Sequence, residues 1–438
     1  MTPHRRIDEA SPVRIALLGC GTVGSAVARL LTEQAEDLRV RAGRRLELVG
    51  IAVRDTTRER PGIDSSLLTD DPLALVTAEE VDLVVELIGG IEPARELVLA
   101  ALDRGASVVT ANKALLATHG AQIFETAERN GRDVYFEAAV AGAIPIIRPL
   151  RESLVGDEIT SIIGIVNGTT NYILDKMHSD KQTFESALTE AQELGYAEAD
   201  PTADVAGHDA AAKAAILAGL AFHCRVRAEE VFCEGITEVT PEDIAAAESM
   251  DSVMKLLAIC QVNPEDETVA VRVHPTMVPR KHPLASVDGA YNAIFIESQS
   301  AGRLMFYGPG AGGSPTASAV MGDLVTVARN LVRGATGPGE SSYRGLAVAD
   351  AGAIRTAYHI RLQVADVAGT LESVAACFAR NHVSVRAVRQ EAQGAVGEAV
   401  ELVIVTHVAR TQDLDAAVAE LRLLDQVTGP VRPMRVEG

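Results

Sequence analysis

The residues best suited to chemistry are four carboxylates and one lysine in the segment 194–213. They are Glu198, Asp200, Asp204, Asp209 and Lys213. An alanine-rich run predicts a helix that opens at or just before Asp209, so Asp209 and Lys213 project from the same helical face. The apolar residues that follow predict burial, and a buried lysine needs a carboxylate partner. The pair indicates a proton-transfer site, although an ordinary i,i+4 ion pair has the same pattern.

Composition restricts the class of protein. The chain has 438 residues, too many for one hydrophobic core, so we expect two or three domains. A net charge of −20 disfavours nucleic-acid binding. Five scattered cysteines without a CxxC pair favour reduced thiols and a cytoplasmic location over disulfides or zinc. No long apolar segment is present, so we expect neither a membrane span nor a secretory signal.

A coenzyme-binding turn is predicted near the start of the chain. An apolar, β-branched run leads into the pattern G-x-G-x-x-G and then into a helical pattern. In this context Gly21 lets the backbone approach a pyrophosphate, and Gly24 lets the helix pack closely on the strand. We assign five residues of the turn to the coenzyme: Gly19, Gly21, Thr22, Val23 and Gly24. The alternative is a structural turn without a ligand.

The second strand ends at Arg54 and Asp55, where the ribose of the coenzyme is expected. An arginine at this place suits the 2′-phosphate of NADP, whereas an acidic side chain suits NAD. Arg54, followed closely by Arg58 and Arg60, favours NADP. Asp55 keeps NAD open as the alternative.

Strands and helices alternate through residue 136, which predicts a Rossmann-type, doubly wound parallel sheet of the α/β class. Ligands of such sheets bind beyond the carboxyl ends of the strands, where Thr110 and Lys113 lie. We therefore assign both to the coenzyme site, and the alternative for Lys113 is a solvated surface lysine. A second glycine-rich loop leads into a helix within 308–333 and is expected to complete this domain, with Gly312 near the nicotinamide.

The rest of the chain predicts three further parts. Residues 137–307 combine helices with apolar alternation and are expected to form an α+β catalytic and dimerisation domain. A glycine-rich linker covers 334–355. Residues 356–438 are predicted to form the elements strand, helix, strand, strand, helix, strand, which is the order of a ferredoxin-like domain.

Residues 13–330 resemble homoserine dehydrogenase, because five motifs occur in the order found in that family. These are GCGTVG (19–24), TANKALLA (110–117), EAAVAGAIPII (137–147), GIVNGTTNYIL (164–174) and LGYAEADPTADVAGHDAAAK (194–213). The C-terminal part resembles an ACT domain, although Ala368 stands where that pattern usually has proline.

The resemblance implies reversible hydride transfer between NAD(P)H and L-aspartate 4-semialdehyde, giving L-homoserine on the route to threonine, methionine and isoleucine. It implies that Lys213 donates a proton to the oxygen that gains charge, with Lys113 beside it. Four further residues would bind or support the substrate: Thr169, Glu198, Asp204 and Asp209. Among them, Asp204 would orient a lysine.

The resemblance also implies a monovalent cation, sodium, bound at the loop of small residues after position 136. The matching positions are Glu137 and the backbones of Val140, Gly142 and Ile144. A loop with one carboxylate and many carbonyl oxygens suits a hard cation, and no His/Cys cluster suits a transition metal. The alternative is a tight interdomain turn.

For the C-terminal part, the resemblance implies an amino-acid effector, threonine, bound at Asp366, Ala368 and Gly369. Gly369 lets the backbone approach a ligand, and the following helix N-terminus can face its carboxylate. The alternative is a dimerisation module without a ligand. Such modules pair between subunits, so a homodimer or homotetramer is expected.

Two other functions stay open. A phosphorylating semialdehyde dehydrogenase would need a nucleophilic cysteine near the nicotinamide, and none of the five cysteines has an evident catalytic context. A non-enzymatic nucleotide-sensing regulator could use the same domains but would not need Lys113, Lys213 and the carboxylates.

Overall fold

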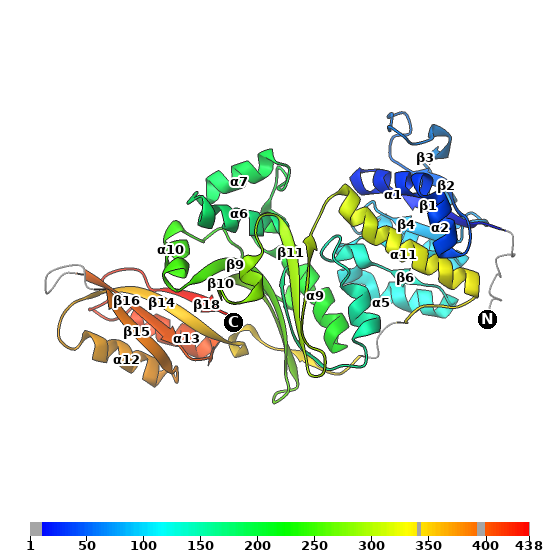
Figure 1. Cartoon of the computed structure of the whole chain (residues 1–438). Coiled ribbons are helices and arrows are strands. Elements are labelled where there is room, and N and C mark those ends of the chain that lie inside the picture. Colours follow the sequence, from blue (N-terminus) through cyan, green and yellow to red (C-terminus); the bar gives the residue numbers. More distant parts are fainter. Residues whose placement is uncertain (1–10, 340–342, 392–398, 438) are drawn as a thin grey trace. The chain divides into compact units, whose positions relative to one another are not determined.

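The computed structural model describes residues 11–339, 343–391 and 399–437, which form two compact units (Figure 1). Unit 1 is built from the segments within 11–168, 208–231 and 290–345. Unit 2 is built from the segments within 169–207, 232–289 and 346–437. Among the described residues no helix is long and apolar enough to cross a membrane.

A six-stranded parallel sheet is the frame of unit 1. Its strands are β1 (Val13–Leu18), β2 (Leu46–Ala52), β3 (Leu68–Thr69), β4 (Leu83–Glu86), β5 (Ser107–Thr110) and β6 (Val134–Tyr135). The spatial order β3-β2-β1-β4-β5-β6 is that of a dinucleotide-binding Rossmann sheet. Every residue of β4 and β5 is buried, as expected for central strands covered on both faces. The predicted α/β class is confirmed.

Helices cover the two faces of this sheet. They are α1 (Thr22–Glu33), α2 (Ala35–Ala42), α3 (Pro72–Thr77), α4 (Ala94–Arg104), α5 (Lys113–Asn130) and α11 (Gly313–Arg333). Figure 1 shows α11, in yellow, alongside the blue helices α1 and α2. Ala317, Val320 and Leu324 of α11 join Val27 of α1 and Ile15 of β1 in one apolar core. The distant segment thus completes the packing of the sheet.

A second set of elements in unit 1 carries the other half of the site. The strands β7 (Ile159–Ile165), β11 (Tyr291–Ser298) and β12 (Gly302–Pro309) are antiparallel, with β11 in the middle. Helix α9 (His208–Phe222) packs against both β7 and α5. Its small, apolar residues Ala210, Ala214 and Ala218 are buried, which allows this close packing.

Unit 2 contains one mixed sheet in the order β9-β10-β18-β14-β16-β15. Its strands are β9 (Ser252–Asn263), β10 (Thr268–Pro279), β14 (Arg355–Ala365), β15 (Val385–Glu391), β16 (Ala399–Thr406) and β18 (Arg432–Val436), with the short β8 (Phe232–Cys233), β13 (Ala347–Val348) and β17 (Ala409–Arg410) at its edges. The helices are α6 (Gly168–Ser179), α7 (Phe184–Glu193), α8 (Thr202–Val205), α10 (Pro241–Ser249), α12 (Thr370–Arg380) and α13 (Thr411–Leu421).

The C-terminal part of unit 2 has the predicted ferredoxin-like topology. The elements follow the order β14, α12, β15, β16, α13, β18, and the strands pair as β18-β14-β16-β15. Ile360, Phe378 and Leu414 lie in the core between the sheet and its two helices. In addition, β18 pairs in parallel with β10 through Thr276 and Met277. This strand therefore joins the ferredoxin-like part to the remaining sheet of unit 2.

Candidate active site

Two lysines in unit 1 share one buried carboxylate. Asp209 forms an ion pair with Lys113 through Oδ1 and accepts a hydrogen bond from Lys213 Nζ at 2.7 Å through Oδ2. The Asp209 side chain is only 6% exposed, whereas those of Lys213 and Lys113 are 12% and 42% exposed. The carboxylate is thus sealed inside the unit, and of the two lysines it is Lys113 that reaches solvent.

Local helix signals explain how these side chains are positioned. Helix α9 begins at His208, so Asp209 stands in its first turn and Lys213 one turn later, as the sequence predicts. Helix α5 begins at Lys113, because the Asn112 side chain accepts a hydrogen bond from the Leu115 N–H and caps the helix. The Lys113 side chain is therefore at a helix start that follows directly on the carboxyl end of β5.

Two further groups from the segment after β7 hold the cluster. Asn167 donates through Nδ2 to Asp209 Oδ2 at 2.9 Å, and the Val166 carbonyl accepts a bond from Lys213 Nζ at 2.7 Å. Asn167 was not predicted to have a role, although it stands in the GIVNGTTNYIL motif. A polar residue just after a buried strand is the sequence feature that could have identified it.

The electrostatics favour an ionised carboxylate between two cations. Burial alone would raise the pKa of the Asp209 carboxyl group, but the Lys213 and Lys113 ammonium groups outweigh burial and hold that pKa well below its usual range. Such a carboxylate keeps two like charges close together without itself exchanging protons near neutral pH. The arrangement can stabilise and protonate an oxygen that gains negative charge.

The glycine-rich turn between β1 and α1 is closely packed at Gly24 and open at Gly21. A Cβ atom at Gly24 would lie 2.2 Å from the Gly19 carbonyl oxygen, so only glycine allows this close approach of helix and turn. A Cβ at Gly21 would meet nothing within 4 Å, so the space in front of this residue is open. Thr22 and Val23 begin helix α1 directly after Gly21, and a helix N-terminus suits an anion.

Other predicted coenzyme residues lie around the same end of the sheet. Gly312 precedes α11, and a Cβ at the next residue, Gly313, would lie 2.9 Å from the Thr22 side chain. Thr110 ends β5 and donates through its hydroxyl to the buried Glu86 of β4 at 2.5 Å. Glu86 also accepts hydrogen bonds from the next turn of the chain, at the Ile88 N–H. Glu86 was not predicted as a site residue, although a carboxylate at the end of an apolar strand is the sequence feature that could have identified it.

Arg54 and Asp55 follow β2 in an exposed loop. The Asp55 carboxylate accepts hydrogen bonds from the Thr57 N–H at 2.9 Å and from the Thr57 hydroxyl at 2.6 Å. These bonds lower the pKa of Asp55 and tie its carboxylate to its own turn. The Arg54 guanidinium, in contrast, is exposed to solvent.

The remaining predicted substrate residues belong to unit 2. Thr169 is buried at the start of α6 and donates to the Tyr196 carbonyl at 2.7 Å. Glu198 is exposed in the loop before α8, and Asp204 lies within that short helix. The predicted role of Asp204 in orienting a lysine stays a prediction, and within unit 1 the carboxylate that contacts both lysines is that of Asp209.

The predicted cation loop is buried and contains an anchored carboxylate. Glu137 Oε1 accepts bonds from the Ile146 and Ile147 N–H groups at 2.5 and 2.7 Å, and Oε2 accepts one from the Arg148 N–H at 3.0 Å. The carboxylate therefore organises the loop, and a cation would have to be held by backbone oxygens.

The backbone of this loop has oxygens to offer. Val140 and Gly142 are buried, and their carbonyls accept none of the backbone hydrogen bonds found among the described residues. The Ile144 carbonyl likewise accepts none of these bonds among the described residues, while its N–H donates to the Ala141 carbonyl at 3.0 Å. No group of three or more His, Cys, Asp or Glu side chains that could hold a metal ion occurs in the described ranges.

A separate cavity of about 240 Å³ lies at the predicted effector loop in the ferredoxin-like part of unit 2. Asp366, Gly369 and Gln390 line it, whereas Ala368 does not. Gly369 has a φ of +92° and caps α12, so the first N–H groups of that helix open toward the cavity.

Comparison with known proteins places this geometry in a family. The family model "Homoserine dehydrogenase, NAD binding domain" matches residues 19–137, and the model "Homoserine dehydrogenase" matches residues 145–325. The homoserine dehydrogenase of Corynebacterium glutamicum is 54% identical over 415 residues, covering 94% of this chain and 93% of the relative. That of Mycobacterium tuberculosis is 53% identical over 436 residues, covering 98% of this chain and 99% of the relative.

Solved structures agree with this result. The crystal structure of a homoserine dehydrogenase from Thiobacillus denitrificans has a TM-score of 0.91 at 41% identity and covers 98% of both chains. A hyperthermophilic archaeal homoserine dehydrogenase in complex with NADPH has a TM-score of 0.62 at 29% identity, covering 72% of this chain and 98% of that one. This chain, with its Rossmann sheet and paired lysines, is therefore an oxidoreductase that belongs to the homoserine dehydrogenase family.

Proposed function

We propose that this enzyme transfers hydride reversibly between NAD(P)H and L-aspartate 4-semialdehyde, giving L-homoserine, with Lys213 and Lys113 as its catalytic residues. The observation that carries the proposal is the single buried carboxylate, Asp209, shared by the two lysines. A coenzyme-binding regulator without a reaction would have no use for two cations held this way.

The chemistry follows from where charge develops. When hydride reaches the aldehyde carbon, the carbonyl oxygen gains negative charge and needs a cation that can give up a proton. Lys213 is the better enclosed of the two and is held by Asp209 and the Val166 carbonyl, so it donates this proton. Lys113 stabilises the charge and exchanges protons with solvent from its more exposed position.

Substrate binding is assigned to both units. Glu198 is exposed and offers its carboxylate to the ammonium group of homoserine, with Thr169 and Asp204 as further substrate contacts. Asp209 was expected to bind substrate directly. Because its carboxylate already contacts both lysines, we assign it first to positioning these ammonium groups, which in turn meet the hydroxyl end of the substrate.

NADP is the proposed coenzyme, and it supplies the hydride when bound. The open space in front of Gly21 and the start of α1 suit a pyrophosphate, and Thr110, Lys113 and Gly312 would contact the nicotinamide end. Arg54 is exposed where a 2′-phosphate would lie, while Asp55 is bonded to Thr57. The archaeal relative was solved with NADPH, which agrees with this choice.

A monovalent cation, sodium, is proposed for the loop after β6. The donors would be backbone oxygens of Glu137, Val140, Gly142 and Ile144. Oxygen donors without thiolate or imidazole suit a hard cation. The loop is also held closely, because a Cβ at Gly142 would lie 2.3 Å from the Gly310 carbonyl oxygen. The cation would stabilise the packing of this loop against the segment at Gly310 that leads into α11.

Threonine is the proposed effector of the ferredoxin-like part, which we consider an ACT domain. The cavity beside Asp366 and Gly369 is small enough for an amino acid, and the N-terminus of α12 can bind its carboxylate. We expect millimolar L-threonine to inhibit the native enzyme. Asp366→Ala and Gly369→Val should abolish inhibition and leave turnover without threonine unchanged. Equal inhibition of both variants would remove this cavity from the regulation.

A homodimer or homotetramer is proposed on the evidence of the strands β11 and β12. Tyr291 of β11 and Tyr307 of β12 stack with their ring centroids 5.1 Å apart, and they are 45% and 56% exposed. Met305 lies on β12 with Tyr307. An exposed apolar sheet face of this kind is typical of subunit contacts. A cytoplasmic location is also proposed and agrees with five free cysteines.

One assay tests the reaction. Purified enzyme is mixed with L-homoserine and NADP⁺ at alkaline pH, and NADPH formation is followed by its absorbance. We expect turnover without added phosphate. Turnover of a semialdehyde that requires phosphate would identify a phosphorylating dehydrogenase. Coenzyme binding with no turnover would identify a sensor.

A further inference from the structure

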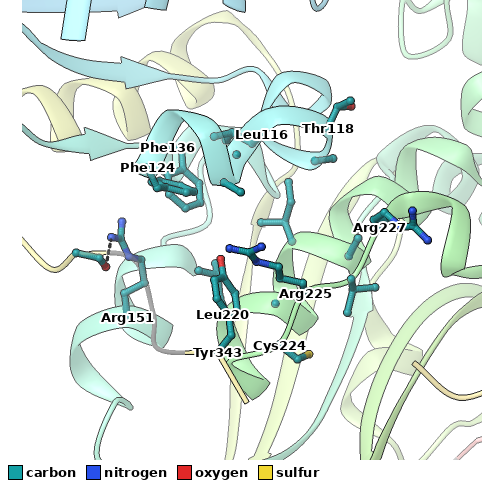
Figure 2. Close-up of a pocket in the computed structure, with 18 residues that line it drawn as sticks. Leu116, Thr118, Phe124, Phe136, Arg151, Leu220, Cys224, Arg225, Arg227 and Tyr343 are labelled. Carbon is teal, nitrogen blue, oxygen red and sulfur yellow. Dashed lines mark hydrogen bonds between the residues drawn. The ribbon is translucent and has the colours of Figure 1, made fainter. Parts of the chain in front are cut away.

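Unit 1 contains a cavity of about 220 Å³ that none of the roles above uses (Figure 2). Its walls are mostly apolar: Leu116, Ala121 and Phe124 come from α5, and Ile216 and Leu220 come from α9. Lys113, Asp209, Lys213 and the glycine-rich turn are not among its lining residues. The cavity is therefore separate from the proposed substrate and coenzyme sites.

Guanidinium groups give this apolar cavity a positive charge. Arg225 lies over the ring of Tyr343 at 4.6 Å, and Figure 2 shows the two side chains together at the cavity. Among the described residues Arg225 forms no ion pair with a carboxylate. Arg227 also lines the cavity but is paired with Glu230 at 3.0 Å. In a chain of net charge −20, an arginine that has no carboxylate partner within 11–339, 343–391 and 399–437 and lies beside an apolar cavity favours an external anion.

The opposite rim is fixed by another arginine. Arg151 donates to the carbonyls of Pro338 and Gly339 at 2.6 and 3.2 Å, and its guanidinium lies over the Phe136 ring at 5.4 Å. Because these contacts hold Arg151 in place, the rim is formed before a ligand arrives. Its remaining charge adds to that of Arg225 across the cavity.

We propose that this cavity binds a small carboxylate with an apolar or aromatic body, and that binding inhibits the enzyme. Pockets for drug-sized ligands have about 300–1,000 Å³, so a cavity of about 220 Å³ selects smaller molecules. The carboxylate pairs with Arg225, whose face stays on Tyr343, and the apolar body lies between α5 and α9.

Inhibition follows from the position of the cavity. The helices that form its walls also carry the lysines: α5 begins at Lys113, and α9 holds Asp209 and Lys213. A ligand held between α5 and α9 changes how these helices pack, and with it the contact between Lys113 and Asp209. The proposed inhibition rests on the proposed catalytic roles of the two lysines, whereas the proposed binding of the carboxylate does not.

The probe is para-fluorophenylacetate, followed by fluorine NMR on the full-length protein. We expect saturable binding with a Kd below about 1 mM, and binding more than about tenfold weaker for the uncharged para-fluorophenylethanol, because a charge-assisted bond is lost. Arg225→Gln should weaken binding about tenfold. Arg227→Gln, the matched control with its arginine already paired, should leave it unchanged.

Two cavity-filling variants locate the site. Ala121→Phe and Ala117→Leu should each abolish binding while the native melting temperature and oligomer size are kept. If both variants are unstable, the Arg225→Gln and Arg227→Gln comparison decides. Binding that is unsaturable, or that is equally affected by the two arginine variants, overturns the site. Binding with unchanged turnover of homoserine overturns only the inhibition.

Discussion

Unit 1 contains two buried carboxylate clusters that differ in what surrounds them. Asp209 meets the ammonium groups of two lysines, one of which is 42% exposed. Asp323 of α11, only 1% exposed, meets the Arg148 guanidinium at 2.6 Å and the Glu137 N–H at 2.7 Å. In both clusters the carboxylate is buried and a cation reaches solvent, but that cation is a lysine in the first cluster and Arg148, 31% exposed, in the second.

The difference shows how the same residue type serves chemistry or structure. Lysine ammonium groups can give up protons, whereas arginine and backbone N–H groups stay protonated and only hold their partners. Burial raises the pKa of Asp323 to about 7 despite the Arg148 contact, while that of Asp209 is held low by its two cations. A carboxylate that supports reactive cations is thus kept ionised, and one that joins a loop to a helix need not be.

The largest effect is expected for substitution of Lys213, which tests whether the Asp209 cluster is catalytic. Lys213→Ala should lower kcat about a hundredfold or more, and Lys113→Ala should lower it less, because a proton donor is lost while the coenzyme turn is intact. Steady-state kinetics and coenzyme titration measure both. Lys176→Ala removes another i,i+4 lysine–aspartate pair, at 2.8 Å from Asp180, and should leave kcat unchanged. A Lys213→Ala enzyme with near-native kcat contradicts the catalytic assignment.

The Asp323 cluster should respond in stability. Asp323→Asn replaces the carboxylate that accepts hydrogen bonds from the Arg148 guanidinium and the Glu137 N–H, leaves Arg148 only the more distant Glu137 carboxylate at 3.9 Å, and should lower the free energy of unfolding by about 2–4 kcal/mol. Urea denaturation measures this change. Asp103→Asn breaks the exposed pair with Arg129 and should cost less than about 1 kcal/mol. If Asp323→Asn unfolds like the native enzyme and loses only kcat, the two clusters do not differ as we describe.

Exposed charged residues should differ from both buried clusters, because their substitution should change ligand binding and leave stability unchanged. Arg54→Ala should weaken NADP(H) binding by about 1–3 kcal/mol, the scale of hydrogen bonds to charged groups, and leave NAD(H) nearly unchanged. Fluorescence titration with both coenzymes measures the difference. Equal weakening of both would assign Arg54 to the fold of its loop.

The smallest effect is expected at Glu198. Glu198→Gln should raise KM for homoserine about tenfold and leave KM for the coenzyme unchanged, because a charge-assisted bond to the ammonium group is lost. Asp200→Asn is the control, since Asp200 already accepts a hydrogen bond from the Thr202 N–H at 3.1 Å. An unaltered homoserine KM in Glu198→Gln would place Glu198 among ordinary surface carboxylates.

Local patterns were sufficient for much of the fold. The parallel, doubly wound sheet was predicted from the alternation of strand and helix patterns, and the shared face of Asp209 and Lys213 was predicted from helical spacing. The ferredoxin-like order was predicted in the same way. These features depend on residues close together in the chain, where sequence spacing determines geometry.

Contacts between distant segments could not be read from such patterns. The pairing of Lys113 with Asp209 depends on how α5 packs against α9, and no local period encodes that packing. The cation site at Glu137 stays a prediction, but the hydrogen bonds of its carboxylate with N–H groups at positions 146–148 were not predicted. The loop has to fold back before these donors reach the carboxylate. The division into three domains and a linker stays a prediction.

The place of β18 has a consequence for how the protein is made. β18 follows every other strand of the unit 2 sheet in the sequence, yet it lies between β10 and β14. Arg272 of β10, 1% exposed, finds its carboxylate partner at Glu437, next to that strand. On the ribosome, the end of β10 at Thr276 and Met277 and the edge of β14 therefore lack their β18 partner until that strand has emerged. A nascent chain stalled before residue 432 would expose these two stretches of strand edge, and strand edges are the parts of a sheet most prone to aggregate.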